Sequence, residues 1–325
     1  MRKVVAETLD SIDGYRIVEA EAPTLGPGEV VVAVEAVGVG YADALVALGR
    51  YQVKPPLPHT PGGEVGGRIA AVGEGVEGLK VGDRVMAQVR GGFAELAVGP
   101  AAGVQVIPEA MTAAEAAGFR INYITALHGL RDRANVQPGE TVVVLGAAGG
   151  VGAAGIQVAK RLGARVIATA STEEKRDFCL SLGADAALDT TPEGWRDRLK
   201  AVAGGAPTVI YDPVCGPLFE PAFRSLGWGG RHLVMGFVGG PIPALPSNLT
   251  LMKGSALVGV DVRQFLIFEP AKGREHLETL MGWVAAGSLK PPVGRAFAFE
   301  DFAPALEFAL TGQGLGKTVV TIVTP

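Results

Sequence analysis

The chain has 325 residues, a hydrophobic fraction of 48% and a net charge of −4 at neutral pH. This length exceeds one ordinary hydrophobic core and predicts two domains. The weak negative charge argues against a nucleic-acid partner and against an anionic membrane surface. The two cysteines, Cys179 and Cys215, lie far apart and outside any Cys-x-x-Cys spacing. This argues against a disulfide framework and indicates a reducing, cytoplasmic setting.

Neither a signal peptide nor a membrane span is expected. The first residues carry a basic pair with no long apolar stretch behind it. Residues 142–159 carry no charge and approach the length of a bilayer span. They are rich in glycine and alanine, however, and follow a Pro138-Gly139 turn, so a buried strand and helix explain them better.

Short β runs fill the first third of the chain. Residues 29–39 alternate and are rich in valine, as in a half-buried strand. Glycine- and proline-rich turns separate the further runs and predict a small barrel-like domain. These runs lie near residues 65–72, 84–87, 94–98 and 104–107.

Helices begin near residue 112, where Thr112 and Glu115 match a capping box. Another helix is expected over residues 125–134. From residue 141 strands and helices alternate, which predicts a parallel, doubly wound sheet. The expected strands are 141–145, 164–170, 184–188, 208–212, 231–236 and 256–260. The expected helices are 150–162, one from a capping box at Ser171–Glu174 to 182, one opened by Thr191-Pro192, and one near 218–226.

The alternation stops after residue 262. Helices are expected over 271–286 and 302–310, and a last strand over 318–323. We expect this tail to return to the first domain. The predicted division is therefore a Rossmann domain, 123–262, inserted in a discontinuous catalytic domain, 1–122 and 263–325.

A glycine-rich turn follows the strand at 141–145 and opens a helix. Gly146 suits the tight turn, Gly149 and Gly150 let backbone amides approach a pyrophosphate, and Gly152 permits helix–strand packing. The helix N-terminus adds partial positive charge. The expected pyrophosphate site is Gly146, Ala147, Ala148, Gly149, Gly150, Val151 and Gly152.

The end of the next strand selects the cofactor. NAD enzymes place a carboxylate there for the ribose hydroxyls, but this strand ends at Ala170-Ser171-Thr172. Ser171, Lys175 and Arg176 could instead hold a 2′-phosphate. The sequence therefore favours NADPH over NADH. The alternative is that Ser171 only caps the helix and Lys175 is a solvated surface residue.

Several motifs together resemble the medium-chain dehydrogenase/reductase superfamily, and within it the quinone oxidoreductase branch. The resemblance covers nearly the whole chain and implies an α/β fold, a Rossmann doubly wound parallel sheet inserted in a discontinuous β-rich GroES-like catalytic domain. The motifs are residues 37–43, 61–67, 81–85, 146–152, 211–214 and 316–320.

The resemblance also implies that catalytic zinc is absent. Zinc-dependent members place a ligand at the positions of Gly40, Gly63 and one near Ile121, and these residues cannot bind Zn²⁺ through side chains. The four histidines show no ligand spacing. Without a metal, the resemblance implies hydride transfer from NADPH to a quinone or an activated carbon–carbon double bond.

Candidate catalytic residues are Tyr41, Asp43, Tyr51 and Asn122, each with a structural role as the alternative. By the resemblance, Thr125 lies close to the nicotinamide. The carboxyl ends of two later strands supply Gly236, Phe237 and Val260 for its amide group. Thr190 and Lys317 complete the expected cofactor set. The branch carries Asn at Gly40 and a cleft Tyr at Leu45, so the substrate pocket is altered here. It also carries a phosphate-binding Tyr where this chain has Thr190.

Two alternatives stay open. An enoyl thioester reductase would need a basic cluster for the coenzyme A phosphate, and Arg50, Lys54, Arg90 and Arg120 could supply one. A non-catalytic NADPH-binding protein would need only the Rossmann half. The expected partner is a small-molecule electrophile. Homodimer formation through the edge strand 256–260 is also expected.

Overall fold

The computed structural model describes residues 1–322 and contains two compact units. Unit 1 comprises Met1–Arg120 and the chain from Trp283 to the end of the described residues. Unit 2 comprises Ile121–Gly282. No helix among the described residues is both long and apolar enough to cross a bilayer.

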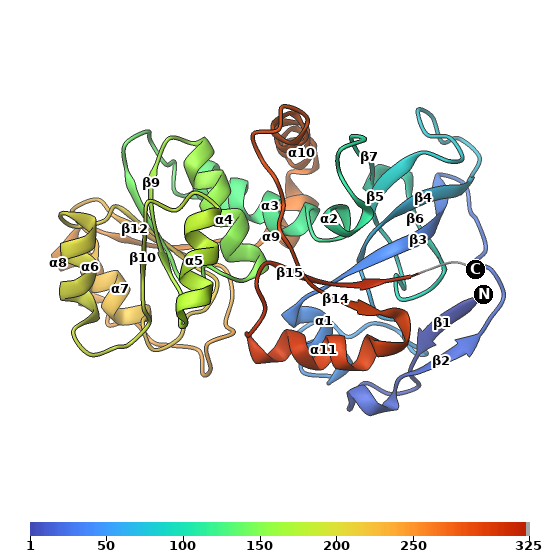
Figure 1. Cartoon of the computed structure of the whole chain (residues 1–325), viewed down its shortest axis with the longest axis horizontal. Coiled ribbons are helices and arrows are strands. Elements are labelled where there is room, and N and C mark those ends of the chain that lie inside the picture. The colour runs from blue at the N-terminus through green and yellow to red at the C-terminus, as the bar shows by residue number, and fades with distance from the viewer. Residues whose placement is uncertain (323–325) are drawn as a thin grey trace. The chain divides into compact units, whose positions relative to one another are not determined.

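Unit 1 is built on a seven-stranded sheet with the order β14-β15-β3-β4-β5-β7, in which β6 also pairs with β3 (Figure 1). Strand β3 is central because its long valine-rich run bonds to three partners, β15, β4 and β6. The strands are β1 (Arg2–Val5), β2 (Arg16–Glu19), β3 (Glu29–Val39), β4 (Glu64–Val72), β5 (Arg84–Gln88), β6 (Leu96–Pro100), β7 (Val104–Val106), β14 (Val293–Ala298) and β15 (Lys317–Thr321).

The helices of unit 1 are short except at its C-terminal end. The expected capping box at Thr112 and Glu115 is confirmed, since each side chain bonds to the other residue's backbone amide. The helices are α1 (Tyr41–Ala47), α2 (Ala113–Ala117) and α11 (Phe302–Thr311), with 3-10 turns at Ile12–Gly14, Ala101–Gly103 and Phe299–Asp301.

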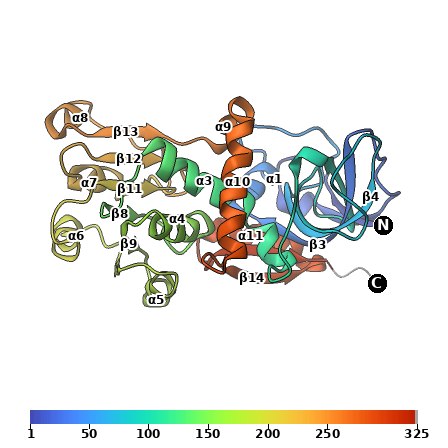
Figure 2. The same ribbon diagram turned by 90° about the horizontal axis from the view of Figure 1, so that it is seen from above.

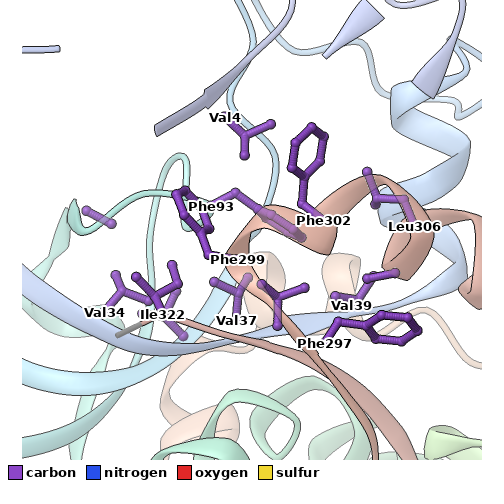
Figure 3. Close-up of a cluster of buried hydrophobic side chains, with 14 of the residues drawn as sticks. Val4, Val34, Val37, Val39, Phe93, Phe297, Phe299, Phe302, Leu306 and Ile322 are labelled. Carbon is purple, nitrogen blue, oxygen red and sulfur yellow. The ribbon is translucent and has the colours of Figure 1, made fainter. Parts of the chain in front are cut away.

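Both ends of the sequence contribute to the core of unit 1. Figure 3 shows Phe299, Phe302 and Leu306 from the C-terminal segment packed toward Val37 and Val39 of β3. Because these residues are almost fully buried, the C-terminal segment completes the N-terminal barrel. The return of the tail to the first domain is what the sequence predicted.

Unit 2 is a six-stranded parallel sheet with the order β10-β9-β8-β11-β12-β13. Figure 2 shows β9, β8, β11, β12 and β13 side by side in that order. Every pair is parallel, as expected for a doubly wound Rossmann sheet. The predicted fold class is confirmed. The strands are β8 (Thr141–Val144), β9 (Arg165–Thr169), β10 (Ala186–Leu188), β11 (Val209–Asp212), β12 (Arg231–Val234) and β13 (Ala256–Gly259).

Two predicted helix starts in unit 2 are wrong. The cap of α5 is Thr172, whose side chain accepts from the Lys175 amide, and not Ser171. Helix α6 begins at Trp195, because Gly194 before it adopts a left-handed conformation. The helices are α3 (Arg120–Leu127), α4 (Gly150–Arg161), α5 (Glu173–Ser181), α6 (Trp195–Ala203), α7 (Phe219–Ser225), α8 (Asn248–Lys253), α9 (Val262–Phe268) and α10 (Pro270–Ala285).

The helix expected over residues 125–134 changes character midway. Helix α3 ends at Leu127 and continues as a π-helix over His128–Arg133. This wider turn brings His128 and Asp132 into one cluster with His276 of α10, at 2.8 and 3.1 Å from the same Asp132 oxygen. The cluster ties α10 to unit 2. By contacts, unit 2 therefore runs to Gly282, whereas the sequence analysis set the second boundary at 262.

Candidate active site

The glycine turn between β8 and α4 is shaped by contacts that leave no room for side chains. A Cβ on Gly152 would lie 2.3 Å from the Gly146 carbonyl oxygen. Gly146 has a φ of +57°, in the left-handed region that favours glycine. Gly149 differs, because a Cβ there would meet only that carbonyl oxygen, at 3.6 Å. The turn thus has no room for a side chain at Gly152, whereas space remains beside Gly149.

The amides of this turn are not equivalent. The Ala147 N–H donates to the Thr169 carbonyl, and the Gly149 N–H donates to the Gly146 carbonyl. Both amides therefore already have backbone partners within the fold. The cap residue Gly149 offers no side chain to the first amides of α4, whose partners lie outside the helix. Residues Gly150 to Gly152 therefore present the N-terminal end of a twelve-residue helix, which suits an anion.

The loop after β11 packs against the glycine turn and against the loop after β12. A Cβ on Gly146 would lie 2.5 Å from Val214 Cγ2, and a Cβ on Gly236 would lie 2.6 Å from the Pro213 carbonyl oxygen. The loop after β11 thus touches both the glycine turn and the loop after β12. The predicted nicotinamide-binding segment, with Phe237 half exposed, lies in the latter loop.

A buried pair that the sequence analysis missed anchors the loop after β11. The Asp212 Oδ1 atom accepts from the Val214 and Cys215 amides, each at 2.8 Å. Its Oδ2 atom lies 2.9 Å from His232 Nε2 on β12. Both side chains are fully buried. The Tyr211-Asp212-Pro213 motif was noted, but His232 twenty residues on carries no local signal.

No carboxylate follows β9 in the sequence before Glu173, and Arg176 lies at the end of this strand within electrostatic range of the Asp189 carboxylate, which follows β10. Arg176 Nη1 donates to the Ala170 carbonyl at 3.3 Å, which brings its guanidinium to the end of the strand. Ser171 is exposed there, and Lys175 and Thr190 are half buried. The arrangement suits a phosphate monoester better than the paired hydroxyls of an unmodified ribose.

Three of the predicted site residues of unit 2, Asn122, Thr125 and Val260, are buried. Thr125 Oγ1 donates to the Ile121 carbonyl at 2.6 Å, within its own helix. Asn122 is 5% exposed, and the Val260 amide donates to the Val234 carbonyl. The side chains of Thr125 and Val260 therefore shape this end of the sheet through packing.

In unit 1, the candidate residues lie at the start of α1 and just beyond it. The Asp43 carboxylate accepts the Gly40 N–H at 2.8 Å. Burial raises the pKa of Asp43, and the nearby Lys317 ammonium opposes that rise. Tyr41 and Tyr51 are both half buried. Asp43 therefore stabilises the turn, while Tyr41 and Tyr51, which are partly exposed, are the candidates for contact with a substrate.

No metal site emerges from the described residues. Among residues 1–322, no group of three His, Cys, Asp or Glu side chains could hold a metal ion. The four histidines show no ligand spacing in the sequence, but in the structure His128 and His276 both contact the Asp132 carboxylate. Lys272 and Arg131 also approach that carboxylate, at 3.4 and 3.6 Å, so cations already surround it.

The basic cluster considered for a coenzyme A phosphate does not form as suggested. Arg90 bonds to Glu29 at 2.6 Å. Arg120 is 8% exposed and directs Nη1 at the Gly103 carbonyl. Burial lowers the pKa of Arg120, and Glu64 partly offsets this. Two of the four cations are thus committed within unit 1.

Comparison with known proteins decides the family. Residues 26–109 match the alcohol dehydrogenase GroES-like domain, and residues 150–284 match the zinc-binding dehydrogenase family. The quinone oxidoreductase-like protein 2 homolog of Nematostella vectensis is 36% identical over 301 residues, 91% of this chain and 82% of that protein. The chain belongs to the zinc-free quinone oxidoreductase branch of the medium-chain dehydrogenase/reductase superfamily. The predicted resemblance is confirmed.

Solved structures of quinone oxidoreductases and of a related reductase share this architecture. The quinone oxidoreductase of Thermus thermophilus, studied also as its NADPH complex, is 34% identical, with a TM-score of 0.84 over 99% of this chain and 100% of that one. The CurK enoyl reductase is 26% identical, with a TM-score of 0.89 over 99% of both chains. The same fold therefore occurs in both quinone and enoyl reductases.

Proposed function

We propose that this quinone oxidoreductase family member is an NADPH-dependent reductase that transfers hydride to a quinone or an activated carbon–carbon double bond without a metal. The observation that carries the proposal is the end of β9, where Arg176 is held at the Ala170 carbonyl and the residues that directly follow, Ser171 and Thr172, carry no carboxylate. A carboxylate there would repel a 2′-phosphate, whereas two cations and a hydroxyl attract it.

The residues present fit NADPH. The open position at Gly149 leaves room for a pyrophosphate against the amides of Gly150, Val151 and Gly152. Ser171, Lys175 and Arg176 would hold the 2′-phosphate. When bound, the cofactor supplies the hydride. We assign Thr125, Gly236, Phe237 and Val260 to shaping the nicotinamide end, and Thr190 to the adenosine end.

We assign the substrate side to unit 1. Asp43 orients the turn at Gly40, because its carboxylate already accepts that N–H. Tyr41 and Tyr51 are the candidates to donate a proton through Oη once hydride has added to the electrophile. Asn122, which lies in unit 2, is assigned to orienting the substrate carbonyl. A quinone or enone is already electrophilic, so positioning of the reactants and exclusion of water can supply most of the lowering of the activation barrier without a Lewis acid.

A second candidate, an enoyl thioester reductase, is favoured by the likeness to the CurK enoyl reductase. Against it stands the commitment of Arg90 to Glu29, which removes one cation from a coenzyme A site. A third reading, NADPH binding without turnover, needs only unit 2.

The test is a panel of quinones, enones and acyl-CoA alkenes assayed with NADPH and NADH, with and without a chelator. We expect chelator-resistant turnover that prefers NADPH, and the best substrate then distinguishes a quinone reductase from an alkene or thioester reductase. Saturable NADPH binding without turnover on any substrate would support the binding-only role. Chelator-sensitive alcohol oxidation would refute the zinc-free assignment.

We also propose that two copies pair through β13. This strand is the edge of the unit 2 sheet. Leu257 on β13, Leu251 and Met252 on α8 and Trp228 are exposed apolar side chains, and Trp228 lies over Gly254 between α8 and β13. An exposed sheet edge flanked by apolar side chains is suited to pairing with a second copy. A small-molecule electrophile and a cytoplasmic setting complete the proposal.

A further inference from the structure

Two glycines of unit 1 have backbone angles that any residue adopts. Gly118 has a φ of −109° and Gly40 a φ of −123°. Neither needs glycine for a left-handed turn. The reason for glycine must therefore lie in what occupies the space beside each Cα.

Lys317 occupies that space at Gly118. A Cβ on Gly118 would lie 2.6 Å from Lys317 Cγ and 2.8 Å from Lys317 Cβ, and its three nearest neighbours all belong to Lys317. Farther along the same side chain, Lys317 Cε lies 3.0 Å from the Cβ position of Gly38. The aliphatic stem of Lys317 thus lies in a track lined by two glycines, with its direction fixed.

The track ends at Gly40. A Cβ there would meet Lys317 Nζ at 3.3 Å and Asp43 Oδ2 at 3.4 Å, with no other described atom within 4 Å beyond its chain neighbours. Asp43 Oδ2 also accepts the Gly40 N–H. An ammonium and a carboxylate therefore share the place of the missing side chain, and their attraction opposes the cost of burying Asp43.

We infer that Lys317 is a positioning residue for the Gly38–Tyr41 turn and not a contact of the cofactor. Its ammonium lies with the Asp43 carboxylate beside the Cβ position of Gly40, the carboxylate accepts the Gly40 N–H, and this bond holds the turn at which α1 begins. A lysine on the last strand thereby sets the geometry of a turn near residue 40. The consequence for catalysis rests on the proposed function; the consequence for the turn does not.

The test combines amide hydrogen exchange with cofactor affinity and turnover in the full chain. Lys317→Met keeps the stem and removes the charge, and Lys317→Arg keeps a charge. Lys80→Met, an exposed lysine of the same unit, is the matched control. We expect Lys317→Met to speed exchange over residues 38–47 by about tenfold, lower kcat by about tenfold and leave the NADPH Kd unchanged, with partial rescue by Lys317→Arg.

Unchanged exchange over residues 38–47 would overturn the inference, whatever happens to turnover. A rise in NADPH Kd without faster exchange would also overturn it and return Lys317 to the cofactor set. If the wild-type chain turns over no substrate, the proposed function fails, while the exchange result still decides the role of Lys317.

A double-mutant cycle provides a second arm that does not depend on activity. Gly118→Ala alone places a methyl against the Lys317 stem, and Lys317→Ala removes the atoms from Cγ outward. We therefore expect the loss of thermal stability caused by Gly118→Ala to be smaller in the Lys317→Ala background. Equal losses in both backgrounds would show that the stem does not occupy this track.

Discussion

His232 Nε2 donates to Asp212 Oδ2 across 2.9 Å, and neither side chain is exposed to solvent. The pair joins the carboxyl ends of β11 and β12, and the same carboxylate holds the loop after β11 through the Val214 and Cys215 amides. Since that loop packs on Gly146 and Gly236, one carboxylate orders the surroundings of the proposed cofactor site.

Asp212→Ala should therefore be strongly destabilising. It leaves His232 and two amides buried without their acceptor, which should cost about 3 kcal/mol of unfolding free energy. Asp212→Asn, whose carbonyl oxygen can still accept from the loop amides, should cost about half as much or less. Urea unfolding at neutral pH measures both, with the exposed Asp197→Ala as control. Equal effects of the three variants would contradict the anchoring role.

Two glycines of the β8–α4 turn should respond differently to alanine. Gly152→Ala forces a methyl to within 2.3 Å of the Gly146 carbonyl oxygen, so we expect loss of stability of about 2 kcal/mol or more. Gly149→Ala meets nothing closer than 3.6 Å, so the fold should persist while NADPH binding weakens by about tenfold or more. Thermal melts and fluorescence titrations separate the two. Intact NADPH affinity in Gly149→Ala would place the pyrophosphate elsewhere.

Charge at the end of β9 should decide between the two nicotinamide cofactors. Arg176→Ala and Lys175→Ala should each weaken NADPH binding by about 10- to 100-fold, because a charge-assisted bond to the 2′-phosphate is lost, and should leave NADH binding nearly unchanged. Ser171→Asp should reverse the preference. The measurement is the Kd for both cofactors, with Lys200→Ala on exposed α6 as control. A parallel loss for NADH would mean that these residues do not read the 2′-phosphate.

The Asp132 cluster should make stability depend on pH. Burial acts to raise the pKa of Asp132, but the hydrogen bond with His128, the close approach of His276 and the charge of Lys272 outweigh it and hold that pKa well below its ordinary value. A carboxyl with a depressed folded-state pKa stabilises the fold above its unfolded-state pKa of about 4, and this contribution is lost as the pH falls below it.

Asp132→Asn should accordingly lower the unfolding free energy by about 3 kcal/mol at pH 7. The difference from the wild type should shrink as the pH is taken from about 5 downward. Denaturant unfolding across this range, compared with the exposed Asp177→Asn, measures it. A deficit of Asp132→Asn that stays constant down to about pH 3 would contradict the proposed charge pairing.

Pairing through β13 should be sensitive to charge introduced at exposed apolar positions. Leu257→Arg or Trp228→Arg introduces like charges on both copies of a self-complementary interface, so we expect monomers where the wild type is dimeric. Light scattering after size exclusion measures the mass. A variant that remains dimeric would locate the interface away from β13.

The sequence alone determined the features that are local in the chain. The strand, glycine turn and helix around residue 146 are contiguous, and so is the missing carboxylate at Ala170, so both could be recognised without coordinates. The repeated strand–helix alternation fixed the parallel sheet. Local patterns were less decisive at helix starts, because Ser171 and Thr172 are both good caps and only the path of the chain selects Thr172.

Only the tertiary structure decided the contacts between distant residues. Asp212 meets His232, Asp132 meets His276, and the Lys317 stem takes the space beside Gly118 and Gly40. None of these pairs is marked by a recognisable spacing or repeat in the sequence. These contacts are set by the strand order and by the return of the C-terminal segment to unit 1. The residue types show which chemical groups are present, and the fold alone decides which of them come into contact.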